Sequence, residues 1–161
     1  MCNKKNKIMF LLLILFMTST ILLIFYSINV EKNIKKDMVY SCPGIIGNAI
    51  DEVLYLDNKW ETISNVEKLV KLNNIKNEYD KILFIFSHAD IYFSYLKNIK
   101  DDIIALEITI GNNNLEFFDK TDLKNMYYDF STLFNLIVMD DIFKLSSDEI
   151  NKMFVKVEGN E

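Results

Sequence analysis

The residues best suited to chemistry share one feature: each of them follows an apolar run of the length of a β-strand. They are Asp57, His88, Asp90, Asp140 and Asp141. An imidazole and carboxylates can act as general base and general acid, and the same groups can bind a divalent metal. The sequence therefore raises two hypotheses for one site. The first is catalysis by the last four of these residues, and the second is a metal site that also includes Asp57.

Whether these side chains meet depends on how the runs before them are arranged. If the runs are neighbouring parallel strands, their carboxyl ends lie at one edge of the sheet, where α/β proteins bind ligands. The alternative is structural: Ser87 or Asp90 caps the start of a following helix, and Asp140 with Asp141 ends a strand at the solvent. We favour the structural interpretation. Catalysis and metal binding stay hypotheses that require these side chains to share a pocket.

Motifs with a stronger chemical signal are missing from the sequence. It contains no G-x-x-x-x-G-K-[ST] loop, no G-x-G-x-x-G, no G-x-S-x-G elbow and no C-x-x-C. No cofactor is therefore predicted, and a divalent metal is expected only if the acid and histidine site exists.

One short segment resembles a known metal-binding loop. Ser-His-Ala-Asp-Ile is similar to the His-Pro-Asp-Asp loop of the zinc-dependent N-acetylglucosaminyl de-N-acetylases, and the resemblance would make His88 a ligand and Asp90 a base. Ile91 stands in place of the second acid of that loop. A chain with one histidine also lacks the family's further histidine ligand, so the chain is not assigned to this family.

Charge is divided unevenly along the chain. Residues 1–37 carry six Lys against two acidic residues, whereas residues 38–161 carry 12 Lys against 21 acidic residues, for a net charge of −9. The chain contains no Arg. Phosphate neutralisation supplies most nucleic-acid affinity, and only Arg offers a planar fork to phosphate or guanine. We therefore expect no nucleic-acid partner.

The clearest element is an apolar segment near the N-terminus. After a basic tail at 1–7, residues 8–30 form a stretch of 23 residues without a charge. A helix of that length spans about 34 Å, which is enough to cross a bilayer. A cleaved signal peptide is the alternative, but the apolar run is too long for one and no small-x-small cleavage site follows it. The sequence therefore predicts an uncleaved signal anchor, a transmembrane helix and a single-pass membrane protein.

The orientation of this segment depends on a small charge difference. Three Lys precede the segment and three follow it closely, so lysine counting gives a tie. The α-amino group on one side, and Glu31 with Asp37 on the other, favour a cytoplasmic N-terminus. The acidic remainder of the chain would then be extracytoplasmic.

Cys2 and Cys42 lie on opposite sides of the apolar segment, and neither belongs to a cluster with metal-ligand spacing. No intrachain disulfide is expected. Two interpretations of Cys42 stay open: an interchain disulfide that links a homodimer close to the membrane, or a small residue without a role of its own.

Beyond the membrane segment, apolar runs of strand length alternate with segments of helical period. Residues 31–50 are expected to form a linker, because they are charged at first and then contain the sole proline, Pro43. The runs expected as strands are 53–56, 82–86, 103–110, 115–118 and 133–139. Helices are expected from Thr62, from Tyr92, from Leu123 and after Ser146, with capping boxes at Ser64 and Ser146.

This alternation predicts one small α/β domain over 51–158, with about four to five strands and about four helices, followed by a polar tail at 159–161. A hairpin between 103–110 and 115–118 would make the domain α+β instead. Because recognisable catalytic machinery is missing, we expect a binding module: an accessory, assembly or inhibitory protein with a protein partner. The alternative function is a small hydrolase or transferase at the carboxyl edge of the strands, with or without a divalent metal.

Overall fold

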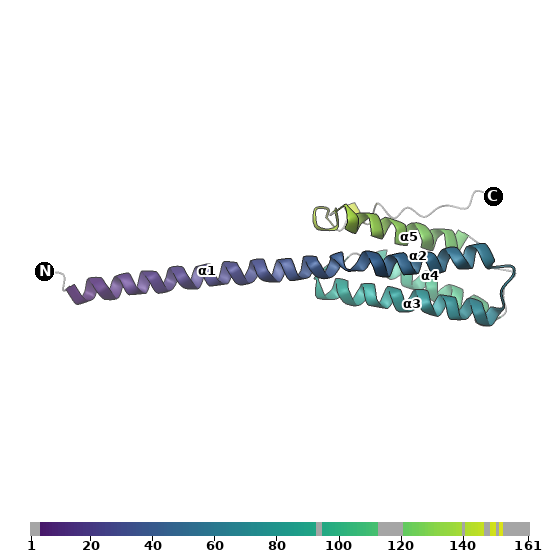
Figure 1. Ribbon diagram of the computed structural model, residues 1–161, viewed down its shortest axis with the longest axis horizontal. Coiled ribbons are helices and arrows are strands. Elements are labelled where there is room, and N and C mark those ends of the chain that lie inside the picture. Colours follow the sequence, from purple (N-terminus) through teal and green to yellow (C-terminus); the bar gives the residue numbers. More distant parts are fainter. Residues whose placement is uncertain are drawn as a thin grey trace. The chain divides into compact units, whose positions relative to one another are not determined.

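The computed structural model describes residues 4–92, 95–112, 121–139, 141–146, 149, 150 and 152. Within these residues the regular elements are helices, and no strand occurs. They are α1 (Lys4–Tyr40), α2 (Cys42–Lys59), α3 (Asn65–His88), α4 (Tyr95–Gly111), α5 (Thr121–Val138) and the short 3₁₀ helix η2 (Asp141–Phe143) (Figure 1). The chain divides into two compact units, Met1–Asp37 and Met38–Glu161.

α1 contains the apolar segment 8–30 and extends beyond it at both ends. The side chains of this segment are exposed on every side of the helix. Its polar interruption is satisfied locally, as predicted: the hydroxyls of Thr18, Ser19 and Thr20 donate to carbonyls one turn earlier, at 3.0, 2.9 and 2.8 Å. By length and composition, α1 is long and apolar enough to cross a membrane.

The segment 31–50 is helical, whereas the sequence suggested a linker. α1 continues to Tyr40, and α2 begins at Cys42 after the single residue Ser41. Pro43 lies in the first turn of α2, where its fixed φ suits the helix and its missing N–H has no intrahelical partner to lose. The proline therefore starts a helix, and the charged residues before it prolong α1.

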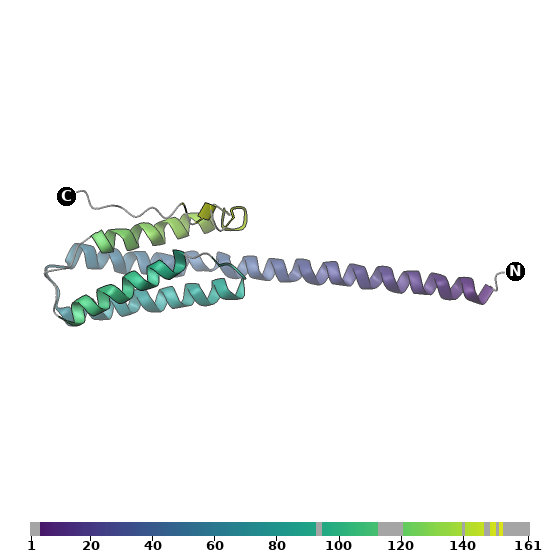
Figure 2. The same ribbon diagram turned by 180° about the vertical axis from the view of Figure 1, so that it is seen from behind.

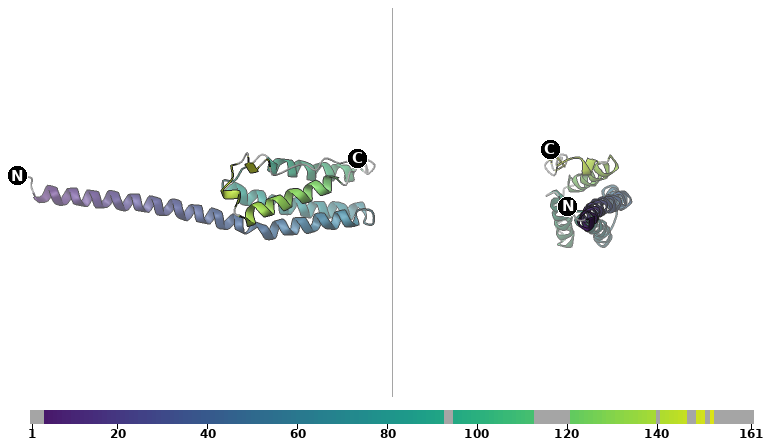
Figure 3. Two further views of the ribbon diagram at one scale, coloured as in Figure 1. Left: turned by 90° about the horizontal axis from the view of Figure 1, so that it is seen from above. Right: turned by 90° about the vertical axis from the view of Figure 1, so that its left-hand side faces the viewer.

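The second unit is a helical bundle built from α2 to α5. α2 and α3 are antiparallel neighbours joined by the turn at 60–64, and α5 packs along another side of α2. α4 packs mainly against α3 and lies at an angle to it (Figure 2). Figure 3 shows these helices from above and end-on, around a shared interior. We call the end where Met38 begins the unit the proximal end, and the end at the α2–α3 turn the distal end.

The predicted α/β domain over 51–158, with its α+β alternative, is wrong, because the described residues of this range contain no strand. Instead, each helix of the bundle buries a stripe of side chains whose spacing alternates between three and four residues. The stripes are Cys42, Ile46, Ala49, Val53 and Leu56 in α2; Leu72, Ile75, Tyr79, Ile82 and Phe86 in α3; Leu96, Ile99, Ile103, Leu106 and Ile110 in α4; and Leu123, Met126, Phe130, Leu133 and Ile137 in α5. Such spacing is typical of helices packed side by side in a bundle.

The runs expected as strands are the final parts of these helical stripes. Residues 53–56 lie in α2, 82–86 in α3, 103–110 in α4 and most of 133–139 in α5, while the expected strand 115–118 lies outside the described residues. The runs are continuous because positions outside the stripes carry apolar residues too. A short run of this kind has no period that separates a buried strand from a helix.

The predicted capping boxes are confirmed to different degrees. Ser64 precedes α3, and its Oγ accepts a hydrogen bond from the backbone N–H of Glu67 at 3.2 Å. Ser146 and Glu149 form the reciprocal pair: the Ser146 N–H donates to Oε2 of Glu149 at 2.8 Å, and the Glu149 N–H donates to Ser146 Oγ at 3.4 Å. The hydrogen bonds from Ser146 lower the pKa of Glu149.

Tyr79 joins three helices in the core. Its hydroxyl donates to the carbonyl of Leu96 at the start of α4, and its ring packs edge-on against Phe130 of α5, with 6.5 Å between ring centroids. Burial raises the pKa of the Tyr79 hydroxyl, so this group remains a hydrogen-bond donor across the neutral pH range. The contact holds the N-terminal turn of α4 against α3.

Candidate functional site

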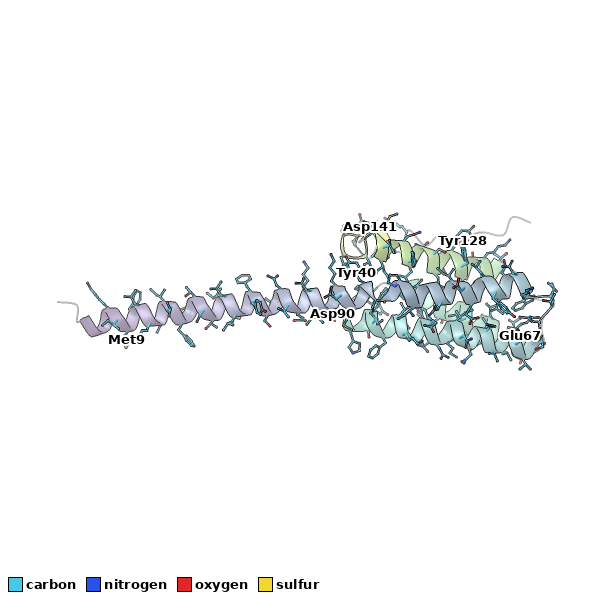
Figure 4. All side chains as sticks on the ribbon, in the orientation of Figure 1. Met9, Tyr40, Glu67, Asp90, Tyr128 and Asp141 are labelled. Carbon is cyan, nitrogen blue, oxygen red and sulfur yellow. The ribbon has the colours of Figure 1, made fainter. Side chains whose placement is uncertain are left out.

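The structure separates Asp57 from the other described residues considered for catalysis or metal binding. Asp57 lies near the end of α2, at the distal end, whereas His88 ends α3 and Asp90 follows it at the proximal end. Asp141 begins η2, also at the proximal end, and Asp140 lies outside the described residues (Figure 4). α3 has 24 residues and is therefore about 36 Å long. Because α2 and α3 are antiparallel, that length separates Asp57 from His88.

The strand edge on which both hypotheses depended does not exist in the described part of the chain. The hypotheses assumed parallel strands, whose carboxyl ends meet at one edge. An antiparallel bundle instead sends the C-termini of successive helices to opposite ends. Among the described residues, no group of three or more His, Cys, Asp or Glu side chains is arranged to hold a metal ion.

The segment containing His88 ends a helix, whereas the sequence suggested a helix start. Asp90 adopts the left-handed conformation, with φ 55°, at the position after a helix that glycine most often occupies. The Ile91 N–H donates to the Phe86 carbonyl at 2.9 Å, and the Asp90 N–H donates to the Ser87 carbonyl at 3.4 Å. This is the bonding of a Schellman motif, so the turn itself satisfies carbonyl groups at the end of α3.

The His88 side chain is exposed and folds back along α3. Its Nδ1 lies 2.8 Å from the carbonyl oxygen of Phe84, one turn earlier. Its ring lies 4.2 Å from the Phe84 ring, at an interplanar angle of 39°. The same carbonyl accepts a hydrogen bond from the Ser87 hydroxyl at 2.8 Å. His88 therefore folds back onto its own helix and contacts the Phe84 ring.

An open polar groove of about 830 Å³ runs between α2 and α3. It is lined by Asn48, Asp51, Glu52, Tyr55, Lys71, Asn74, Asn77, Glu78 and Lys81. Lys71 Nζ lies 2.9 Å from Oε2 of Glu52, and Asn74 Nδ2 donates to Oε1 of the same carboxylate at 3.1 Å. Nearby, the Tyr55 hydroxyl donates to Oε1 of Glu67 at 2.7 Å. These bonds cross from α2 to α3 and fix how the two helices are aligned.

The charges of the groove are partly neutralised within it. The hydrogen bond with Glu52 raises the pKa of Lys71, so this ammonium group stays charged. Glu78 pairs through Oε1 with Lys81 at 2.8 Å, while its buried Oε2 accepts no hydrogen bond from the described residues. Three carboxylates and two ammonium groups line the groove, which leaves it slightly acidic.

Phe84 stands between two apolar hollows at the end of this groove. Its side chain is 61% exposed, although it belongs to a helix with a full core stripe. The first hollow, of about 460 Å³ between α2 and α3, is lined by Ile45, Asn77, Asp80, Lys81, Phe84 and Ile85. The second, of about 380 Å³ and reaching α4, is lined by Asp80, Leu83, Phe84, Phe86, Ser87, Ile91, Tyr92 and Leu96.

The groove and the two hollows form one continuous surface, which we call the Phe84 surface. Asn77 and Lys81 line both the polar groove and the first hollow. Asp80 and Phe84 each line both hollows. An exposed aromatic ring with apolar hollows beside it, surrounded by polar and charged groups, is typical of protein interfaces.

Cys42 lies in the core stripe of α2, with 0% of its side chain exposed. Burial raises the pKa of its thiol to about 11, which disfavours the reactive thiolate at neutral pH. A disulfide to a second copy of the chain would therefore require the proximal end of α2 to open.

Sequence reasoning missed the Phe84 surface. It assigned Phe84 to a buried strand, but only Ile82 and Phe86 of that run are fully buried. On a helix, a residue two positions from each of two stripe members points to the opposite face. The alternating three and four spacing is visible in the sequence and would have predicted this exposure. No pattern in the sequence predicts the pairing of Glu52 with Lys71, because this pairing depends on how two helices pack.

Comparison with known proteins assigns no family to the chain. The chain matches no protein-family model, no curated protein and no solved structure. A function is therefore argued from its own residues.

Proposed function

We propose that the protein is a single-pass membrane protein whose helical bundle binds another protein at the membrane surface. Residues 8–30 of α1 are the anchor, and the Phe84 surface is the binding site. The observation that carries the proposal is the exposed Phe84 ring between two apolar hollows. A large aromatic side chain in such a place is typical of the residues that contribute most to protein binding.

The anchor is supported by the distribution of apolar side chains on α1. A helix that is apolar on every side has no face suited to water, and it is stable when other apolar groups surround it. The segment 8–30 is exposed all round and 23 residues long, which matches the hydrocarbon thickness of a bilayer.

The chemistry of the Phe84 surface indicates what kind of partner it suits. Apolar side chains of a partner fill the hollows beside Phe84, as the apolar face of an amphipathic helix fills a groove. Asp80 lies at both hollows, the polar groove is slightly acidic, and residues 38–161 carry a net charge of −9. The partner is therefore a protein segment with apolar anchors flanked by Lys or Arg.

The proposal includes a cytoplasmic N-terminus and an extracytoplasmic bundle, supported by the α-amino group on one side and by Glu31 and Asp37 on the other. A cysteine introduced at the exposed Lys59 tests it, in a chain with Cys2→Ser and Cys42→Ala. A membrane-impermeant maleimide applied to intact cells should label this cysteine. Labelling that requires lysis of the cells would contradict the orientation.

Photo-cross-linking tests the binding site in the native membrane. Benzoylphenylalanine at position 84 should give a discrete adduct with another protein, because the side chain lies at the centre of the proposed interface. The same probe at Ile108 of α4 is the matched control, since Ile108 is 57% exposed and does not line the Phe84 surface. Equal adducts from both positions, or none from position 84, would contradict the proposal.

A charge reversal distinguishes a specific contact from proximity. Asp80→Lys places a positive charge beside Phe84, so it should weaken the adduct from position 84 if the partner is basic there. Glu61→Lys, at an exposed position in the α2–α3 turn, changes the net charge equally and should leave the adduct unchanged. If the two variants behave alike, the partner does not recognise the charge at this surface.

A further inference from the structure

The proximal end of the bundle carries exposed apolar side chains from three separate segments. Tyr40 at the end of α1 and Phe143 of η2 meet edge-on, with ring centroids 5.9 Å apart, and both remain partly exposed. Val138 and Met139, at the end of α5, are also exposed, and the exposed fraction of Met139 is 65%. Tyr92, in the connection between α3 and α4, is 80% exposed, but it also lines the second hollow of the Phe84 surface. We call the other four residues the end patch.

Exposed aromatic rings are concentrated at this end of the bundle. Among the described residues of 38–161, the exposed large aromatic side chains are Tyr40, Phe84, Tyr92, Tyr128 and Phe143. Tyr128 lies in the middle of α5, and the exposed apolar residues near the distal turn, such as Val66, are aliphatic. Figure 4 shows Tyr40, Asp90 and Asp141 at the proximal end and Glu67 at the distal end.

The length of the chain limits how far this end lies from the apolar segment. Only residues 31–37 separate the segment 8–30 from Met38, and they are helical. At a rise of 1.5 Å per residue they span about 12 Å. The headgroup layer on each side of the hydrocarbon core is roughly 5–8 Å thick. If residues 8–30 cross the bilayer, about 12 Å is the largest distance between the hydrocarbon core and the proximal end, and it applies when residues 31–37 stand perpendicular to the membrane. A tilt of these residues brings the proximal end into the headgroup layer.

We propose that the end patch inserts into the headgroup layer of the membrane and seats the bundle end-on at the bilayer surface. Tyrosine and other amphipathic aromatic rings favour this layer, where one side of the ring is apolar and the other is wet. The proposal rests on the proposed anchor but not on the proposed protein partner. Its consequence is that α1 and the end patch together fix the direction in which the Phe84 surface faces.

The test uses the full chain in phosphatidylcholine vesicles, with Cys2→Ser and Cys42→Ala to remove the native thiols. An environment-sensitive fluorophore on Met139→Cys reports on the end patch, and the same label on Val66→Cys reports on the distal end. A label on Leu15→Cys reports on the anchor. Quenching of the first two labels is measured with lipids that carry a nitroxide in the headgroup, and quenching of the third with lipids that carry a nitroxide in the acyl chain.

The expected result is loss of emission at position 139 and at position 15, with none at position 66. Loss at 15 without loss at 139 overturns the end-on seating and leaves the anchor intact. No loss at 15 overturns the anchor and the seating with it. Equal loss at 139 and 66 also overturns the seating, because the bundle would then lie on its side. A blue shift at 139 without lipid quenching would assign the patch to contact with a protein, such as a second copy of this chain.

A charge placed in the end patch distinguishes insertion into the headgroup layer from mere closeness to the anchor. With the label on Phe143→Cys, the change Val138→Asp should reduce quenching, because binding at the boundary between headgroups and acyl chains scales with the apolar area that is buried there. Val70→Asp in α3 is the matched control, since the two valines are 53% and 58% exposed. Circular dichroism is the control that checks whether both variants fold. Quenching that Val138→Asp leaves unchanged would overturn insertion of the patch.

Discussion

α1 and α3 are both long helices rich in apolar residues, but they distribute these residues differently. In the segment 8–30 of α1, apolar side chains are exposed on every side, whereas α3 buries one stripe and exposes the opposite face. A helix without a polar face requires apolar groups on every side, as in a bilayer or a large protein core, and a helix with one apolar stripe requires other helices along that stripe. The same residue types therefore serve two kinds of surroundings, and their arrangement decides which.

The difference also changes what an exposed apolar residue means. In α1 such residues are the rule, and together they make the helix long and apolar enough to cross a membrane. In α3 they are the exception, and the largest of them, Phe84, lies at the candidate binding surface. Substitution of apolar residues should therefore have different consequences in the two helices.

The largest effect is expected from charges in the middle of the anchor. Leu15→Lys combined with Phe16→Lys should release the protein from the membrane fraction, because each Lys at the bilayer centre costs about 2.5–3.5 kcal/mol. Val66→Lys with Val70→Lys, at exposed positions of α3, is the matched control and should leave the protein in the membrane. Membrane flotation measures both. Retention of the α1 variant would show that residues 8–30 are not held in lipid.

The second effect concerns the core stripe. Phe130→Ala should reduce the free energy of unfolding by about 3–5 kcal/mol, because it leaves a cavity where Phe130 packs against Tyr79. Tyr128→Ala, two residues away on the exposed face of α5, should change it by less than about 0.5 kcal/mol. Urea denaturation followed by circular dichroism measures both values. Similar losses in the two variants would contradict the packing of α5.

The elements that sequence reasoning predicted correctly are those with a signal that a few residues carry alone. The apolar segment 8–30 is uniform, and the caps at Ser64 and Ser146 depend only on residues three positions later. The predicted strands were wrong because an apolar run of four to eight residues has no period that separates a strand from a helix. Extending the pattern from Ile82 and Phe86 back to Leu72 reveals the spacing of one helix.

The candidate site could be predicted to a smaller extent. The grouping of His88 with Asp57 required parallel strands, so it failed together with the sheet. The exposure of Phe84 follows from the helical period and could have been predicted. The bond between Glu52 and Lys71 could not, because it depends on the alignment of α2 against α3, which one sequence does not reveal.

The third effect is a loss of bundle stability at alkaline pH. In the folded bundle, burial raises the pKa of Cys42 from its ordinary 9.0 to about 11, and it raises the pKa of Tyr79 as well. The unfolded chain then releases these protons at lower pH than the folded chain, so stability falls as pH rises above about 9. Cys42 alone should account for at most about 2–3 kcal/mol. The urea midpoints of the native chain and of Cys42→Ala, measured against pH, give the contribution of Cys42 to this loss of stability.

A steeper fall in the native chain than in Cys42→Ala supports a buried thiol. Parallel curves would show that Cys42 is accessible in the folded bundle. A dimer on non-reducing electrophoresis that disappears with Cys42→Ser would show the same by a different route, because a disulfide to a second copy requires an exposed thiol.

The smallest effect concerns the end of α3. Asp90→Gly should raise the free energy of unfolding by about 1 kcal/mol, because glycine adopts the left-handed conformation without the penalty of a Cβ atom. Asp90→Ala keeps the Cβ atom and serves as the control, with no gain. Thermal unfolding of the native chain and of the two variants measures the differences in stability. A loss of stability in Asp90→Gly would show that the carboxylate itself contributes to the fold.

Backbone amide exchange of the full chain in lipid nanodiscs tests most directly whether the two kinds of apolar helix have different surroundings. Two protected regions are expected: residues 8–30, shielded by lipid, and the stripes of α2 to α5, shielded by one another. Residues 31–37 between them should exchange faster, because they are helical but lie outside the hydrocarbon core and outside the core stripes of the bundle. Exchange in 8–30 as fast as in 31–37 would contradict the membrane anchor.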